Sequence, residues 1–175
     1  SLAMPLGRFL GTRIRVSVMM LVAVLAVVWR VQSFTTTVLF TAVLFLSVCL
    51  HEVTHLWFLF RIKQRCVERI LWPLGGLFVH PPVKPDPFVC LAGPGMNLVL
   101  AIAAVLQEDV YVEALALLNP MTCWQGLQSD NILIQSLRIC FLVNVIITAA
   151  NLIPVRPMAA GYIFQSLLAK RFPDV

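Results

Sequence analysis

The residues with the clearest capacity for chemistry are two histidines and a glutamate in the segment HEVTH, which runs from His51 to His55. On a helix, residues i and i+4 lie on the same face, so the imidazoles of His51 and His55 can bind one metal ion. Glu52 is near enough to hold and deprotonate a metal-bound water. Zinc lowers the pKa of such a water toward about 7, and the resulting hydroxide attacks a peptide carbonyl. The alternative is a chance occurrence of this spacing on a solvated helix face.

The surroundings of HEVTH favour the metal site over chance. The motif interrupts an apolar run that extends from about Phe34 to Phe60. Two histidines and a glutamate inside a spanning helix cost several kcal/mol unless they are paired or bound to a metal. We therefore expect His51 and His55 to be zinc ligands and Glu52 to be the catalytic residue.

The composition indicates a membrane protein. Of the 175 residues, 60% are hydrophobic and 12% are charged, and the mean hydropathy is +0.91. Soluble domains have about 25% charged residues, so a soluble enzyme and a disordered tail are excluded. The 13 basic residues lie between long apolar runs instead of clustering on a polar face, so we expect no nucleic-acid partner.

Four apolar segments reach or approach the length of about 20 residues that a spanning helix needs. Between the second and the third, the segment VERILWPLGGLFV at 67–79 has two β-prone runs around a Pro-Leu-Gly-Gly turn. The predicted fold class is an all-α polytopic membrane protein with about four transmembrane helices and a short β-hairpin between the second and third. The segments run from about Val16 to Trp29, Phe34 to Phe60, Phe88 to Leu106 and Ile132 to Ile153.

The positive charges orient these segments. The link 61–87 contains five basic residues, whereas the link 107–131 contains no Lys or Arg. Because cytoplasmic loops are enriched in Lys and Arg, we expect a multi-pass protein with both termini in the cytoplasm. His51 then lies about 15 Å from the cytoplasmic end of its span. The five basic residues, interpreted as topology markers, are Arg61, Lys63, Arg65, Arg69 and Lys84.

Three motifs occur in an order that resembles the site-2 proteases, a family of intramembrane zinc metalloproteases. They are HEVTH, LAGPGMN at Leu91–Asn97 and NLIPVRPMAAG at Asn151–Gly161. The resemblance covers nearly the whole chain and implies a single site-2-protease-like transmembrane catalytic core over residues 1–175; because the chain begins at Ser1, a fragment is one of the open alternatives. It also implies that Asn97 and Asn151 line the active-site cavity and bind substrate. The alternative for both is hydrogen bonding between helices.

One position departs from the family pattern. The third zinc ligand of the family is an Asp, and the aligned residue here is Ala159. A catalytic zinc site normally has three protein ligands and an open position for water. Three explanations stay open: an engineered loss of the ligand, a natural pseudoprotease, or a divergent enzyme that recruits another group. The remaining histidine, His80, is interpreted as a loop residue near the membrane interface.

Small and polar residues near the motifs are predicted to serve packing. Gly93 and Gly95 are expected to let their helix approach the HEVTH helix closely. Asn144 is interpreted as a packing residue. The Gly75–Gly76 pair either turns the hairpin or exposes an edge strand to an extended substrate.

The leading hypothesis is an intramembrane zinc metalloprotease that cleaves a single-span membrane protein near the cytoplasmic leaflet, with its activity impaired by the vacant ligand position. Its partners are then a transmembrane protein substrate and the lipid bilayer. The alternative is a non-catalytic pseudoprotease that binds transmembrane helices, although such a protein needs no base at Glu52. A third alternative, a transporter with a proton relay, rests only on the presence of intramembrane ionisable residues.

Overall fold

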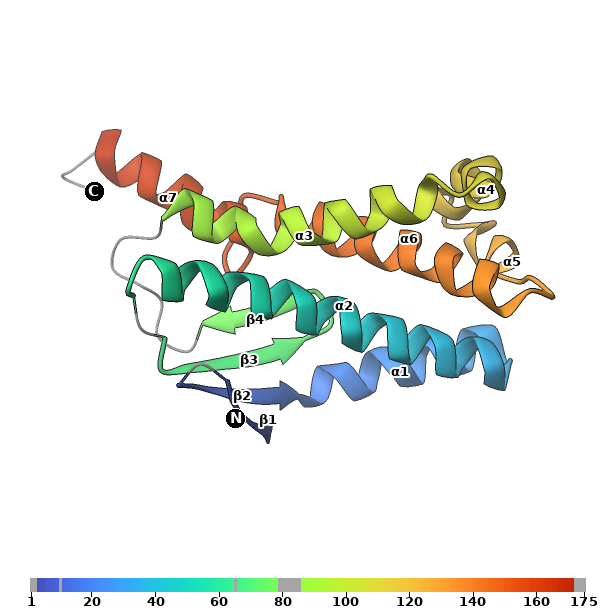
Figure 1. The fold of residues 1–175 in the computed structure, drawn as a ribbon, viewed down its shortest axis with the longest axis horizontal. Helices are drawn as coiled ribbons and strands as arrows, with labels where there is room; N and C mark the ends of the chain where they lie inside the picture. Colours follow the sequence, from blue (N-terminus) through green and yellow to red (C-terminus); the bar gives the residue numbers. More distant parts are fainter. Residues whose placement is uncertain (1–2, 10, 65, 79–85, 172–175) are drawn as a thin grey trace.

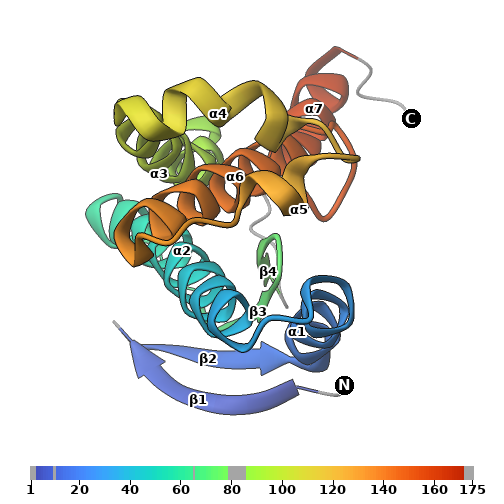
Figure 2. The ribbon, with the colours of Figure 1, turned by 90° about the vertical axis from the view of Figure 1, so that its right-hand side faces the viewer.

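The computed structural model describes residues 3–9, 11–64, 66–78 and 86–171, so the predicted loop residue His80 lies outside the described residues. The described chain is mostly helical, with a small four-stranded sheet (Figures 1 and 2). In chain order the elements are β1 (Ala3–Phe9), β2 (Thr12–Ser17), α1 (Val18–Val31), α2 (Phe34–Arg61), β3 (Glu68–Trp72), β4 (Gly75–Phe78), α3 (Pro87–Val105), α4 (Glu108–Leu118), α5 (Cys123–Gly126), α6 (Ile132–Asn151) and α7 (Ala159–Arg171).

Three of the described helices, α2, α3 and α6, are long and apolar enough to cross a membrane. They pack against one another, yet many of their large apolar side chains face outward. Phe34, Phe60, Val99 and Leu133 are each more than 60% exposed. An apolar outer surface of this kind is unfavourable in water and is typical of contact with lipid. The structure therefore indicates a membrane protein.

The first predicted span is shorter than the other three. It corresponds to α1, which has 14 residues and is thus about 21 Å long. It packs along α2, as Figure 1 shows. The count of four spanning helices stays a prediction, because α1 is shorter than the roughly 30 Å hydrocarbon core of a bilayer.

The long helices begin at residues that satisfy their free backbone N–H groups. The Ser33 hydroxyl accepts from the Thr36 amide at the start of α2, and the Asn131 side chain accepts from Leu133 at the start of α6. At the start of α3, Asp86 accepts from two backbone amides, and a proline occupies the first helical position. Such caps are worth about 1 kcal/mol each and fix where the helices begin.

The sheet corrects the all-α expectation. The predicted hairpin is present as β3 and β4, but β1 and β2 add two strands in the order β1-β2-β3-β4. β2 pairs in parallel with β3, and the other two pairs are antiparallel. The Arg15 guanidinium contacts the Glu68 carboxylate at 3.0 Å across the parallel pair. The apolar run predicted as a span from Val16 therefore starts inside β2, and Ser17 caps α1.

The elements place both ends of the described chain at the same end of the helix bundle. The sheet, the Arg61 end of α2 and α7 lie toward one end in Figure 1, and α4 and α5 lie toward the other. This arrangement is compatible with both termini on one side of a membrane. Which side that is stays a prediction from the positive charges.

Two single-cysteine variants test the orientation. We expect an impermeant maleimide applied to intact cells to label Met121→Cys and not Lys63→Cys, each in a chain whose native cysteines are replaced by alanine. Met121, at the α4–α5 end, is 83% exposed. Native cysteines are poor reporters, because Cys123 is buried and burial raises the pKa of the Cys66 thiol. Detergent-solubilised protein should label at both positions, and labelling of Lys63→Cys alone on intact cells would contradict the orientation.

Candidate metal centre

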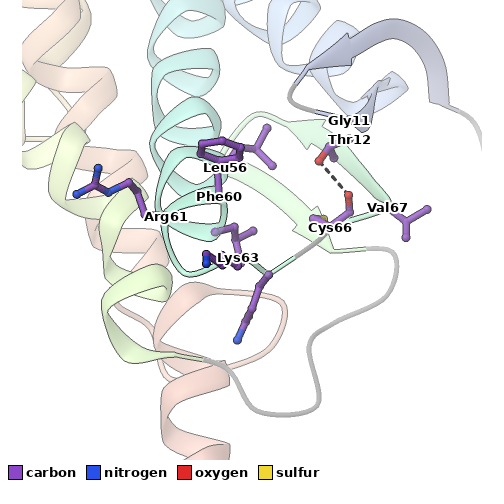
Figure 3. A pocket seen from close by; sticks show the side chains of 10 residues that line it. Gly11, Thr12, Leu56, Phe60, Arg61, Lys63, Cys66 and Val67 are labelled. Carbon is purple, nitrogen blue, oxygen red and sulfur yellow. Dashed lines mark hydrogen bonds between the residues drawn. The ribbon is translucent and has the colours of Figure 1, made fainter.

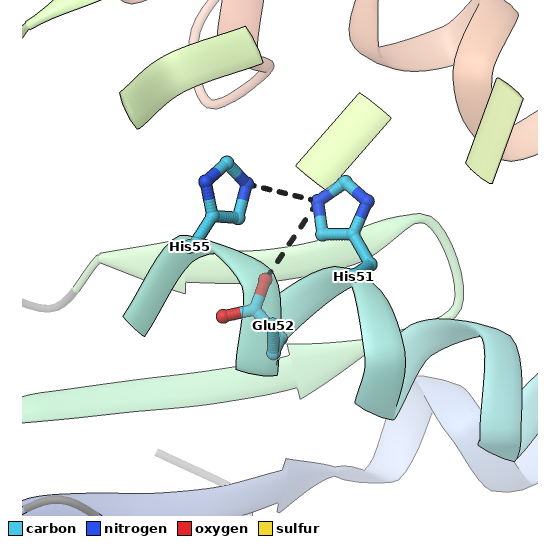
Figure 4. A group of neighbouring side chains, drawn as sticks. All are labelled: His51, Glu52 and His55. Atoms are coloured by element: carbon cyan, nitrogen blue, oxygen red, sulfur yellow. Dashed lines mark hydrogen bonds and ion pairs between the residues drawn. The ribbon is translucent and has the colours of Figure 1, made fainter. Parts of the chain in front are cut away.

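The predicted metal-site residues lie together on the buried face of α2. His51, Glu52 and His55 are each at most 4% exposed, and their candidate ligand atoms lie within 4.8 Å of one another. Both imidazoles project from the same side of the helix, as Figure 4 shows. His51 lies ten residues before Arg61, the last residue of α2, which is about 15 Å along the helix.

The two imidazoles are oriented as a metal-binding pair. His55 Nδ1 donates to the backbone oxygen of Val89 at 2.6 Å, and His51 Nδ1 donates to Asn97 Oδ1 at 2.5 Å. With each Nδ1 used as a donor, the two Nε2 lone pairs are available, and the Nε2 atoms lie 3.1 Å apart. Two nitrogens bound to a tetrahedral zinc are roughly 3.3 Å apart. The pair therefore has the orientation and spacing that a bound metal requires.

Asn97 belongs to a buried chain of polar side chains that fixes His51. Its amide nitrogen donates to Asn144 Oδ1 at 2.6 Å, and Asn144 in turn donates to the Ser47 hydroxyl at 3.0 Å. Asn97 and Asn144 are both fully buried. Asn144 therefore does more than pack, since it connects α6 to both α2 and α3. A role of Asn97 in binding substrate stays a prediction.

Asn151 ties the end of α6 to the hairpin. Its amide nitrogen donates to the backbone oxygen of Leu74 at 2.6 Å and to that of Ile147 at 2.9 Å. Leu74 lies in the turn between β3 and β4. Asn151 also lines the cavity beside the histidines. Its predicted contact with substrate is untested.

Glycines let the backbone approach the site closely. A methyl group on Gly93 of α3 would overlap the rings of His55 and His51, and one on Gly76 of β4 would overlap the Glu52 carboxylate. The expectation for Gly93 is thus confirmed. The same expectation was wrong for Gly95. This residue lies on the exposed face of α3, and a methyl group on it would meet nothing within 4 Å.

Arg69 is a residue of the site that the sequence did not predict. Counted there as a loop charge, it lies on β3 and is 1% exposed. Its Nε lies 2.6 Å from Glu52 Oε2, and its Nη2 donates to Glu52 Oε1 at 3.3 Å and to the Gly76 oxygen at 3.4 Å. The available signal was strand alternation, since Arg69 and the buried Leu71 share one face of β3.

Ala159, the predicted vacant ligand position, faces the histidines. It is the first residue of α7, is 8% exposed, and lines a small cavity of about 10 Å³ together with His51 and His55. Among the described residues that line this cavity, none has a carboxylate. The other lining residues are Arg69, Gly76, Cys90, Asn151, Pro157 and Tyr162.

A larger cavity, of about 980 Å³, lies beyond the site at the end of α2 (Figure 3). The residues that line it include Leu56 and Phe60 of α2, Lys63 just after α2, Gly11 just before β2, and Thr12, the first residue of β2. Neither histidine of the motif contributes to its wall. It is therefore separate from the candidate metal centre.

The comparisons with known proteins agree with this architecture. The sequence matches no family model and no curated protein. Among solved structures, the site-2 protease from Methanocaldococcus jannaschii superimposes with a TM-score of 0.72 over 97% of this chain and 73% of that chain, at 22% sequence identity. The chain has the fold of a site-2 protease. The resemblance first seen in three short motifs thus extends to the arrangement of the whole chain.

The residues of this cluster fit a metal ion in part. The paired Nε2 atoms have the spacing of two ligands of a tetrahedral metal, and the His51–Glu52–His55 group could hold one. The methyl side chain of Ala159 offers no ligand atom. That Ala159 marks a vacant ligand position stays a prediction.

A matched pair of alanine substitutions tests how tightly α3 packs on the histidines. We expect Gly93→Ala to lower the free energy of unfolding by about 1–3 kcal/mol, because the added methyl group displaces both imidazoles. Gly95→Ala, two residues away on the same helix, should raise it by about 0.5–1 kcal/mol. Thermal unfolding in detergent, followed by tryptophan fluorescence, measures both. Equal effects of the two changes would contradict the close approach.

Proposed function

We propose that the chain is an intramembrane zinc endopeptidase whose activity is impaired by the absence of a third metal ligand. The observation that carries this proposal is the convergence of His51 Nε2 and His55 Nε2, 3.1 Å apart, with the Glu52 carboxylate beside them. The site-2 protease fold of the chain supports it, as does the position of Asn97 and Asn151 beside the histidines.

Each residue of the cluster has a distinct role in this proposal. His51 and His55 hold the zinc through Nε2, and Asn97 and Val89 keep both rings in the required tautomer. Zinc, when bound, polarises the peptide carbonyl and lowers the pKa of its water. Glu52 Oε1, which lies 3.8 Å from His51 Nε2, would act as the base toward an attacking water and then as the acid toward the departing amine.

The proposed substrate is a single-span membrane protein cut near the cytoplasmic leaflet. The cluster lies about 15 Å from the basic end of α2, so a peptide bond cut there lies within the bilayer. A helical substrate must unwind, because its amides are shielded by their own hydrogen bonds. Asn97 and Asn151 are proposed to steady the unwound backbone, with Asn151 already bound to the hairpin turn at Leu74.

A second candidate function follows from Ala159. Two neutral imidazoles bind zinc more weakly than two imidazoles with a carboxylate, so the chain as it stands is also compatible with a pseudoprotease that binds transmembrane helices without cutting them. The buried Glu52 argues against this candidate. A protein that only binds helices needs no base beside the paired imidazoles, where Glu52 lies.

The first test measures metal content. We expect zinc to copurify with the chain at less than one equivalent and to leave readily with a chelator, because only two protein ligands hold it. His55→Ala should abolish the binding. Full occupancy that resists a chelator would show that a third protein ligand is present. Elemental analysis of the detergent-purified chain provides the measurement.

The second test restores the missing carboxylate. We expect Ala159→Asp to increase cleavage of a membrane-embedded test substrate by about 10–100-fold, the range seen when groups that support a metal are lost. Ala159→Asn is the matched control, since it adds similar volume without a charge, and it should have little effect. Glu52→Gln in the Ala159→Asp background should remove activity, because it deletes the base.

The outcomes of this second test separate the two candidate functions. A chain that cleaves equally well with Ala or Asp at position 159 contradicts the ligand assignment. An Ala159→Asp variant that binds zinc firmly and never cleaves favours the pseudoprotease.

A further inference from the structure

The Glu52 carboxylate, the proposed base, forms a buried ion pair with the guanidinium of Arg69. Arg69 reaches from β3 to the Glu52 carboxylate with Nε 2.6 Å from Oε2 and Nη2 3.3 Å from Oε1. Both side chains are 2% exposed. The contact spans only 17 residues of sequence, but it joins the sheet to the membrane helix α2. Gly76 makes room for it, because any larger residue would overlap the carboxylate.

One oxygen of the paired carboxylate also lies near the histidines. Arg69 Nε contacts Oε2, whereas Oε1 accepts from Arg69 Nη2 and lies 3.8 Å from His51 Nε2. Arg69 therefore fixes the direction in which the carboxylate points. It also lines the same small cavity as His51, His55 and Ala159.

The charges of this cluster balance without a metal. Glu52 supplies one negative charge and Arg69 one positive charge, and Ala159 supplies none. A divalent cation on the histidines would add its whole charge to a buried site, where an uncompensated charge is costly. An aspartate at position 159 would offset half of that charge, and the removal of Arg69 would offset the other half.

We infer that Arg69 is a positioning residue that directs the Glu52 carboxylate and, through its own charge, lowers the affinity of the His51–His55 pair for zinc. Ala159 and Arg69 then act together, one by withholding a negative charge and the other by adding a positive one. This inference rests on the proposed function for the identity of the metal. It does not depend on whether the chain cleaves a substrate.

The zinc affinity of four proteins tests the inference. The full chain, Arg69→Met, Ala159→Asp and the double variant are purified in detergent, and zinc dissociation constants are measured by competition with a chromophoric chelator. We expect each single change to tighten zinc binding by about tenfold or more, and the double variant to bind most tightly. A merely structural role for Arg69 predicts weaker binding on its removal, so unchanged or weaker binding in folded Arg69→Met overturns the inference.

Arg15 provides a matched control. It also lies on the sheet and pairs with a glutamate, Glu68, at 3.0 Å, but its side chain is 32% exposed and does not line the cavity. Arg15→Met should leave the zinc dissociation constant unchanged. An equal gain in Arg15→Met would show a general effect of net charge and overturn the assignment to Arg69.

In Arg69→Met the buried Glu52 carboxylate loses its ion-pair partner, so a second comparison of zinc affinities uses variants that lack this carboxylate. Glu52→Gln should bind zinc more weakly than the original chain, because the charge of Arg69 is then no longer offset. Glu52→Gln/Arg69→Met should recover the affinity by about tenfold or more. If Arg69→Met alone fails to fold, this pair decides, and equal affinities in its two members overturn the inference.

Two further outcomes separate this inference from the proposed function. If Arg69→Met tightens zinc binding while no variant cleaves a substrate, the inference stands and the protease proposal fails. The unmodified chain could also prove to bind zinc firmly and to lose this binding in Cys90→Ser. In that case the Cys90 thiolate supplies the missing negative charge, and the charge argument for Arg69 is overturned.

Discussion

Two imidazoles and a carboxylate buried in an apolar helix impose the constraint on which the rest of this structure depends. Inside a membrane protein each such group needs a partner from the protein, because neither water nor lipid supplies one. His55 uses the Val89 backbone, His51 uses Asn97, and Glu52 uses Arg69. These contacts draw α3 and the sheet against α2. The contacts that orient the site residues are therefore also contacts that pack the bundle.

The same constraint explains the small residues around the cluster. Gly93 lets α3 come near enough for Val89 and Asn97 to reach the imidazoles, and Gly76 lets the hairpin close over the carboxylate. Gly161, just inside α7, allows its first turn to lie against the backbone of Val155, where a methyl group would overlap. This close approach supports the start of α7, where Ala159 faces the histidines.

Ala159 and Arg69 change the electrostatics of the site in the same direction. A third ligand with a negative charge would favour a divalent cation, whereas a guanidinium on the neighbouring carboxylate opposes it. The chain has the fold of a site-2 protease, and in it two paired imidazoles lie beside the Glu52 carboxylate. Shape and charge therefore make separate contributions to what the site can bind.

The sequence by itself determined the features that depend on local spacing and on solvent. Apolar runs predicted the membrane helices α2, α3 and α6, and the i, i+4 spacing brought His51 and His55 onto one face. The Pro-Leu-Gly-Gly turn predicted the hairpin. Contacts between distant segments were beyond such reasoning. The pairing of β2 with β3 directs Arg69 into the core, and α6 brings Asn144 to Asn97. Only the tertiary structure decided these contacts, because they depend on which elements meet and in what register.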